Sequence, residues 1–415
     1  MRLPPRTFVP ILRNRRRLAL RFWLLLGAVY AIVFLVADRL MFVLDRDELH
    51  FWPTSVGFSG HFDLSTLRQY SELNTPLCFI IFGQFARFSE HGLWLARCFN
   101  LALSACVLVL IAYARGRVTL RSLLASAGLI TCAYFILFST HVYSDTIAAF
   151  CVSLGLWLQL RGRFLGAASA WTLAIATRQY MVAFPLAVAG WEYFRQRPSA
   201  RHVSCAWVLP LIAAASLAVW MILFGGLVPP NMAVGVWPAD RGRFFLDHSL
   251  YFVTCVGVYY GIPNLLIFGW TPRLNHAFGV RTMVLAIILA LMFAVAPPLK
   301  NSAPSVSTMG YLDKGAHWMV DGFPAATALR VTVFYACALW TVLRFAHASL
   351  ATWLVASNAA VMIGAPQAWD KYVVPLVCTL WLLDARPRCN GICRTRPCRS
   401  VDPQLICGRL CKTLF

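Results

Sequence analysis

The sequence predicts an all-α polytopic integral membrane protein with about 12 transmembrane helices, between about 11 and 13. Of its 415 residues, 60% are hydrophobic and only 13% are charged, which leaves too little polar surface to cover a soluble core of this size. Long apolar runs recur along the whole chain, as expected for helices that pack against lipid. Basic and acidic residues also separate onto opposite sides of these runs, which is typical of a multi-pass protein.

The first apolar run, Leu18 to Ala37, follows a basic stretch at Arg13–Arg17. A cleavable signal peptide is the alternative, but the run is long enough to span a membrane and no small-x-small cleavage site follows it. Eleven further apolar segments start near His91, Leu120, Thr146, Phe164, Tyr180, Ser204, Leu250, Thr282, Ala325, Ala348 and Val373.

The stretch Phe164–Gly190 is interpreted as two short helices that meet at Arg178-Gln179. One continuous helix would place the basic segment Arg195–Arg201 outside and invert every later loop. Two helices keep all the arginine clusters on one side of the membrane, so we favour the division.

Charge sets the orientation of this layout. With the N-terminus inside, 25 of the 37 Lys and Arg residues fall on the inner side, and 13 of the 16 Asp and Glu residues fall on the outer side. The net charge of +21 would indicate nucleic acid in a soluble protein, but no aromatic-studded basic motif or zinc-finger pattern supports that partner. Membrane lipid is expected instead, and nucleic acid is not.

The chain divides into one transmembrane domain, residues 1–384, and a basic cytoplasmic tail, residues 385–415, that is expected to be disordered. The tail holds five of the 14 cysteines, but no C-x-x-C pair or His partner favours the alternative of a zinc site. The first outer loop, residues 38–90, contains an apolar piece, Pro76–Phe88, suited to a helix on the membrane surface. Two later outer segments, 225–249 and 297–322, are also expected, and the second is expected to be mobile.

The first outer loop begins with Asp45-Arg46-Asp47-Glu48-Leu49-His50, directly after a span. Carboxylates and an imidazole at this boundary are costly unless they are solvated, paired or used. Asp47 and Glu48 are therefore candidate catalytic bases that could take a proton from an acceptor hydroxyl, with His50 beside them for binding. The alternative is that these acids merely solvate a helix end.

Cations that could receive the charge of a leaving phosphate also lie outside. They are Arg97 near the start of the second span, Arg178 with Gln179 at the helix break, and Lys371 with Tyr372 before the last span. Each alone could instead snorkel or form an ion pair. Asp145 lies at a tight outer turn, where it could orient a substrate, pair with Arg178 or cap the following helix.

These residues, taken in order, resemble the terminal α-1,2-glucosyltransferases of lipid-linked oligosaccharide assembly, which use dolichyl-phosphate glucose and have the C-type glycosyltransferase (GT-C) fold. The similarity runs from Asp47 to Pro375. It rests on Asp47-Glu48-Leu49-His50, Pro53, Leu73-Asn74-Thr75-Pro76-Leu77, Arg97-Cys98-Phe99-Asn100, Tyr143-Ser144-Asp145, Arg178-Gln179 and Lys371-Tyr372-Val373-Val374-Pro375. The chain departs from that pattern at Tyr180-Met181, where the family has Thr-Asn.

The resemblance implies an inverting hexosyltransferase with a polyprenyl-phosphate sugar donor, a glycan or lipid-linked acceptor and a carboxylate base in the first outer loop. It names no obligatory cofactor, and a divalent metal stays open because the fold family includes members with and without one. Arg far outnumbers Lys, as in GC-rich genomes, so a bacterial inner-membrane relative is favoured over an endoplasmic-reticulum enzyme. A transporter or lipid-linked sugar flippase, and an assembly protein without catalysis, are the competing functions.

Overall fold

The structure is a computed structural model that describes residues 8–45, 47–60, 63–196, 204–235, 244–269, 279–298, 310–320, 322–365 and 367–386. Within these ranges every regular element is a helix, as the composition predicts. Arg46, the segment 197–203 that contains Arg197 and Arg201, and nearly all of the expected tail lie outside the described residues.

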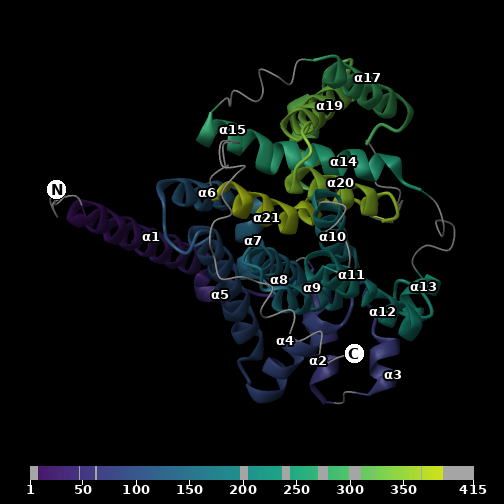
Figure 1. The fold of residues 1–415 in the computed structure, drawn as a ribbon. Coiled ribbons are helices and arrows are strands. Elements are labelled where there is room, and N and C mark those ends of the chain that lie inside the picture. Colours follow the sequence, from purple (N-terminus) through teal and green to yellow (C-terminus); the bar gives the residue numbers. More distant parts are fainter. Residues whose placement is uncertain are drawn as a thin grey trace.

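The N-terminal half of the chain supplies a helical core and residues 38–90, the segment predicted as the first outer loop and called by that name below. Its elements are α1 (Phe8–Val36), η2 (Asp38–Leu40), α2 (Glu48–Gly60), α3 (Leu64–Gln69), α4 (Leu77–Phe88), α5 (Gly92–Ala112), α6 (Leu120–Ile130), α7 (Ala133–Thr140), α8 (Ser144–Gln159), α9 (Phe164–Thr177), η3 (Gln179–Val182) and α10 (Ala183–Arg195). Figure 1 shows α1 extending away from the other helices, while α2, α3 and α4 gather at one end of the molecule.

The second half adds helices on several sides of this core: α11 packs against α9 and α10, α13 contacts α3, and α21 packs against α8. Its elements are α11 (Cys205–Ala215), α12 (Leu217–Phe224), α13 (Pro230–Gly235), α14 (Leu246–Val256), the π-helical turn η6 (Gly257–Gly261), α15 (Ile262–Phe268), α17 (Val280–Val295), α18 (Tyr311–Val320), α19 (Ala326–Arg344), α20 (Leu350–Met362), η7 (Asp370–Val373) and α21 (Val374–Asp384). In Figure 1 the helices α14, α17 and α19 lie at the end opposite α2, α3 and α4.

Five helical stretches are long and apolar enough to cross a membrane, and the bent pair α6–α7 makes a sixth if it is counted as one span. The chain is therefore a multi-pass integral membrane protein. A helix also begins within four residues of 11 of the 12 predicted starts, whereas α1 begins ten residues before the predicted Leu18. Several of these helices are too short to pass the same test. The five stretches are Arg16–Val36, Gly92–Ala112, Cys205–Phe224, Leu246–Phe268 and Ala326–Arg344.

The predicted break near Arg178 is present, and the chain reverses there. Arg178, which follows α9, pairs with Asp145 at the start of α8. Gln196, which follows α10, donates to Ser204 at the start of α11, and Gln159 at the end of α8 bonds to Ala206 of the same helix. The ends of α8 and α10 thus lie together, opposite Arg178.

The centre of the molecule is formed by α8 and α21, whose residues are nearly all buried. Small residues let neighbouring helices approach α8 closely. At Gly155, for example, an added Cβ would overlap the ring of Trp171 on α9. This close packing holds the first turn of α8, which carries Asp145, in a fixed place.

The outer segments contain more helix than the sequence indicated. The stretch after Asp47, predicted as a loop, forms α2. The helix predicted at Pro76–Phe88 is present as α4, and it packs against α2 and α5. The segment 297–322 was expected to be mobile, yet its residues 311–320 form α18, which Asp313 ties to Arg330 of α19 at 2.6 Å. Residues 299–309 and 236–243, in the two later outer segments, lie outside the described residues.

Candidate active site

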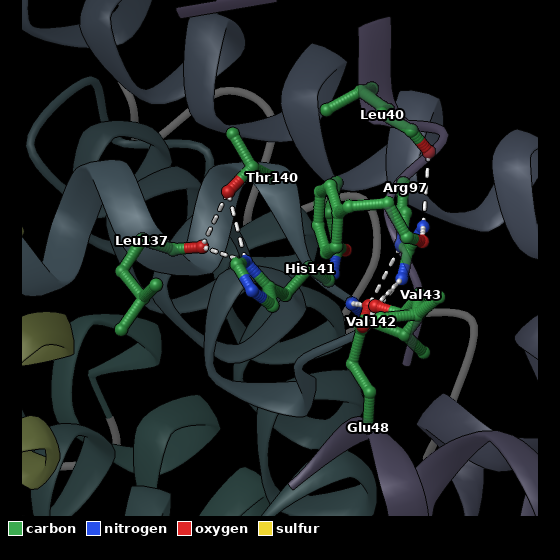
Figure 2. Close-up of polar contacts among 10 residues, drawn as sticks. Leu40, Val43, Glu48, Arg97, Leu137, Thr140, His141 and Val142 are labelled. Carbon is green, nitrogen blue, oxygen red and sulfur yellow. Dashed lines mark hydrogen bonds and ion pairs between the residues drawn. The ribbon is translucent and has the colours of Figure 1, made fainter. Parts of the chain in front are cut away.

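Glu48 and Arg97 form a buried ion pair at the base of the first outer loop. The Nε and Nη2 atoms of Arg97 donate to the two carboxylate oxygens of Glu48 at 3.0 and 2.6 Å. The backbone N–H of Val142 donates to the same carboxylate at 2.6 Å, so the pair also anchors the segment before α8 (Figure 2). The side chain of Glu48 is 0% exposed and that of Arg97 is 1% exposed. The bidentate geometry makes this a strong ion pair, and its burial keeps substrate away from both side chains.

The rest of the Arg97 guanidinium holds a strained turn. Its Nη1 donates to the carbonyls of Leu40 and Phe42 at 3.0 and 2.7 Å. Asp38, Arg39 and Leu40 have φ angles of 44°, 51° and 64°, a left-handed conformation that non-glycine residues rarely adopt. The bonds to Arg97 stabilise this turn at the point where the first span enters the outer loop.

Asp47, next in sequence to Glu48, points elsewhere. Its Oδ2 forms an ion pair with Nζ of Lys371, which precedes the last helix. The Asp47 side chain is 34% exposed and that of Lys371 is 13% exposed, so this pair can be reached from outside, unlike Glu48–Arg97. Lys371 Nζ also lies 5.8 Å from the ring centroid of Tyr143 and 5.1 Å from that of Trp369.

A second ion pair lies at the start of α8. Arg178 Nη2 is 2.5 Å from Asp145 Oδ2, and Arg178 Nε donates to Ser144 Oγ at 2.8 Å. The hydroxyl of Tyr180 donates to the other oxygen of Asp145 at 3.2 Å. Asp145 therefore pairs with Arg178, one of the three roles predicted for it. It does not cap α8, because the N-cap position is Tyr143 and no side chain forms a cap hydrogen bond there.

Aromatic rings surround these charges. Tyr180 and Tyr372 lie with their ring centroids 5.4 Å apart, and the Arg178 guanidinium carbon is 5.7 Å from each ring. Cations on aromatic faces keep part of their charge compensated without a second carboxylate. The predicted residue Tyr372 thus joins Arg178 and Lys371 in one cluster.

Polar side chains fasten the first outer loop to this cluster. Gln179 Nε2 donates to the carbonyls of Leu73 and Leu227 at 2.7 and 2.9 Å. Thr75 Oγ1 donates to the carbonyl of Ile175 on α9 at 2.7 Å. Gln179 is therefore engaged with backbone, which makes it a link between loops in this structure.

Three predicted residues, Glu48, His50 and Arg97, stand apart from the cluster. His50 lies on α2 with its side chain exposed, and none of the described residues gives that side chain a hydrogen bond. Arg97 is turned toward Glu48 and backbone carbonyls beneath the loop. The residues brought together are Asp47, Asp145, Arg178, Lys371 and Tyr372.

Glu72 is a member of the site that the sequence did not single out. Burial raises its pKa to about 7, and the negative charge of Asp47 adds to that effect, whereas Arg178 and Lys371 act against it. Glu72 precedes Leu73, whose carbonyl is held by Gln179, so the loop fixes its place. No motif marks Glu72, and only its position four residues before the predicted Pro76–Phe88 helix could have indicated it.

The charges available for chemistry are a half-exposed carboxylate, a second carboxylate with a raised pKa, and two cations beside them. Among the described residues no group of three or more His, Cys, Asp and Glu side chains is arranged to hold a metal ion. The arrangement can accept a proton at Asp47 or Glu72 and can bind an anion at Lys371. The side chain of Arg178 is only 4% exposed, so its positive charge acts on such an anion from beneath the surface.

Comparison of the sequence with protein-family models gives no match, and comparison with curated proteins gives none either. Among solved structures, the chain is similar to ArnT from Cupriavidus metallidurans bound to undecaprenyl phosphate. The TM-score is 0.42 and the sequence identity 12%, over 87% of this chain and 77% of that one.

Proposed function

We propose that the chain is a membrane glycosyltransferase that moves a hexose from a polyprenyl-phosphate donor to a glycan or lipid-linked acceptor. The observation that carries the proposal is the meeting of the Asp47–Lys371 and Asp145–Arg178 pairs. These four residues come from four distant parts of the sequence. A half-exposed carboxylate beside two cations is what transfer of a sugar from a phosphate requires.

The reaction follows from those groups. Asp47 takes the proton of an acceptor hydroxyl, and the acceptor oxygen attacks the anomeric carbon of the sugar. The bond between that carbon and the phosphate oxygen breaks, and the lipid phosphate leaves with the electron pair. Lys371 and Arg178 receive the charge that develops on the phosphate. A single displacement of this kind inverts the anomeric configuration.

Of the two predicted bases, we propose that Asp47 is the one that acts in the reaction. Both oxygens of Glu48 are held by Arg97 and the carboxylate is fully buried, so proton transfer from a substrate would first require an open ion pair. We assign Glu48 and Arg97 to the support of the loop that presents Asp47. His50 and Gln179 are proposed to contact substrate only at the rim of the site.

The same proposal includes the membrane setting. We infer that the site faces the non-cytoplasmic side, that the short helices bring the crossings to about 12, and that the protein works in a bacterial inner membrane. The distribution of basic and acidic residues supports the side, and the ordered motifs support a GT-C enzyme similar to the terminal α-1,2-glucosyltransferases.

Mass spectrometry of products tests the function. Purified protein is incubated with polyprenyl-phosphate hexoses and extracted lipid-linked acceptors, with and without a chelator of divalent metals. An acceptor heavier by one hexose, formed by the wild type and lost in Asp47→Asn, is the expected result. Transport of lipid-linked sugar across vesicles without any such product would instead indicate a flippase.

A further inference from the structure

Asp370 is a buried carboxylate directly beside Lys371 in the chain. Its Oδ2 accepts a hydrogen bond from the Tyr259 hydroxyl at 2.8 Å and one from the backbone N–H of Leu312 at 2.9 Å. Its side chain is 0% exposed, and within the described residues it forms no ion pair. Burying a carboxylate costs free energy when all its hydrogen-bond donors are neutral, so we expect Asp370 to have a role that offsets this cost.

The two donors come from different elements. Leu312 lies in the first turn of α18, the helix between spans that the sequence did not predict. Tyr259 lies in the π-helical turn η6, a rare element that is frequent at functional sites. Asp370, the residue before Lys371, therefore contacts both the helix α18 and the irregular turn η6.

The start of α18 fits closely against Asp370. At Gly310 an added Cβ would overlap Asp370 Oδ1, so only glycine allows this approach. The neighbouring backbone N–H of Tyr311 donates to the Tyr134 hydroxyl at 2.8 Å, and the rings of these two tyrosines lie 4.8 Å apart. These contacts dock α18 on α7 and on η7.

The position of Asp370 links this docking to the site. Asp370 and Lys371 are the first two residues of the short helix η7, so a shift of one backbone moves the other. If α18 leaves, Asp370 loses the Leu312 N–H and η7 loses a contact that fixes it. The ammonium group of Lys371 then loses its fixed place opposite Asp47.

We propose that Asp370 is a positioning residue that joins the docking of α18 to the placement of Lys371. The inference rests on the proposed function, because it assigns Lys371 the charge of the leaving phosphate. Asp370 does not touch substrate. It acts through Lys371, and Gly310 is needed because its missing side chain leaves room for Asp370.

Two glycines of the same segment provide a matched test. Gly310→Ala inserts a methyl group against Asp370, whereas Gly315→Ala, five residues along in α18, meets nothing within 4 Å. Both substitutions introduce alanine into the same short segment. An effect that appears in Gly310→Ala but not in Gly315→Ala therefore comes from the contact with Asp370 and not from a general effect on the helix. Asp370→Asn is the second variant, in case Gly310→Ala does not accumulate in the membrane.

Three measurements are made on purified protein. Hydrogen exchange reports the Leu312 amide, the rate of acetylation reports the Lys371 amine with exposed Lys314 as reference, and kinetics report KM for a polyprenyl-phosphate hexose. In Gly310→Ala and Asp370→Asn we expect faster exchange, faster acetylation of Lys371 and a donor KM about tenfold higher, the factor for one lost hydrogen bond. Gly315→Ala should match the wild type in all three.

The inference is overturned if Gly310→Ala and Asp370→Asn expose the Leu312 amide but leave the Lys371 acetylation rate unchanged. It is also overturned if Gly315→Ala has the same effects as Gly310→Ala. Failure of the proposed function is a different result, because a wild type that transfers no hexose from any donor still gives the exchange and acetylation comparisons.

Discussion

Lys371 Nζ and Asp47 Oδ2 form an ion pair although 324 positions separate them in the chain. The pair joins the first outer loop to the turn before the last helix. A donor phosphate that reaches Lys371 would compete with Asp47 for the ammonium group, so binding of the donor would free the carboxylate that takes the proton.

Asp47→Asn should reduce transfer by about 100- to 10,000-fold, the usual effect of removing a general base. The measurement is the initial rate at saturating donor and acceptor. Glu90→Gln, which changes an exposed acid at the far end of the same loop, is the matched control and should keep its rate. Equal rates in Asp47→Asn and the wild type would remove Asp47 from the chemistry.

Glu48→Gln should act on stability. Arg97 would keep its charge in a buried place without the carboxylate, which costs about 3 to 5 kcal/mol in the free energy of unfolding. Denaturant titration in detergent measures this change, again beside Glu90→Gln. A stable Glu48→Gln protein that has lost transfer would return Glu48 to the role of base.

Arg178→Lys keeps the positive charge but loses the planar fork that contacts both Ser144 and Asp145. We expect a donor KM about tenfold higher with folding preserved, since Asp145 retains a cationic partner. Titration of the donor checks it, with Arg87→Lys at an exposed position as control. An unchanged donor response would exclude Arg178 from phosphate binding.

Glu72 makes stability depend on pH. Its pKa rises from 4.5 in the unfolded chain to about 7 in the folded protein, so the folded state binds more protons between these values. Stability should therefore fall as pH rises from about 4.5 to about 7, and Glu72→Gln should remove that fall. Melting temperatures across this window measure it. Asp47→Asn should lower the pH of the midpoint, because the Asp47 charge raises the pKa of Glu72.

The inferred orientation is open to chemical labelling. In a background without native cysteines, His50→Cys should react with a membrane-impermeant thiol reagent added outside sealed right-side-out vesicles. Arg117→Cys, exposed near the opposite end of α5, should react only after the vesicles are opened. The reverse pattern would place the site in the cytoplasm and contradict a lipid-phosphate donor on the outer face.

Much of the helical framework could be predicted from the sequence, because apolar runs and basic clusters are local signals. The break at Arg178 is an example, since the arginines of the next loop decided it. The meeting of Asp47, Arg178 and Lys371 followed from placing three polar segments on one side. Their catalytic roles stay predictions.

Other features had no local signal. Glu48 and Asp47 are neighbours in sequence, yet Glu48 is buried against Arg97 and Asp47 is half exposed. Only the direction in which α2 starts determines which of the two carboxylates is buried. Glu72 and Asp370 gain their character from distant partners. Likewise α18 is stabilised by contacts with Tyr134 and Asp370, which hydropathy does not report.

The π-helical turn η6 directs two adjacent tyrosines to carboxylates at opposite ends of the η7–α21 segment. Tyr259 reaches Asp370 at one end of the η7–α21 segment, and Tyr260 reaches Asp384 at its other end. Each residue turns a helix by about 100°. Deleting one residue within Gly257–Gly261 would swing both hydroxyls off their carboxylates at once, so the length of this span is constrained to the single residue.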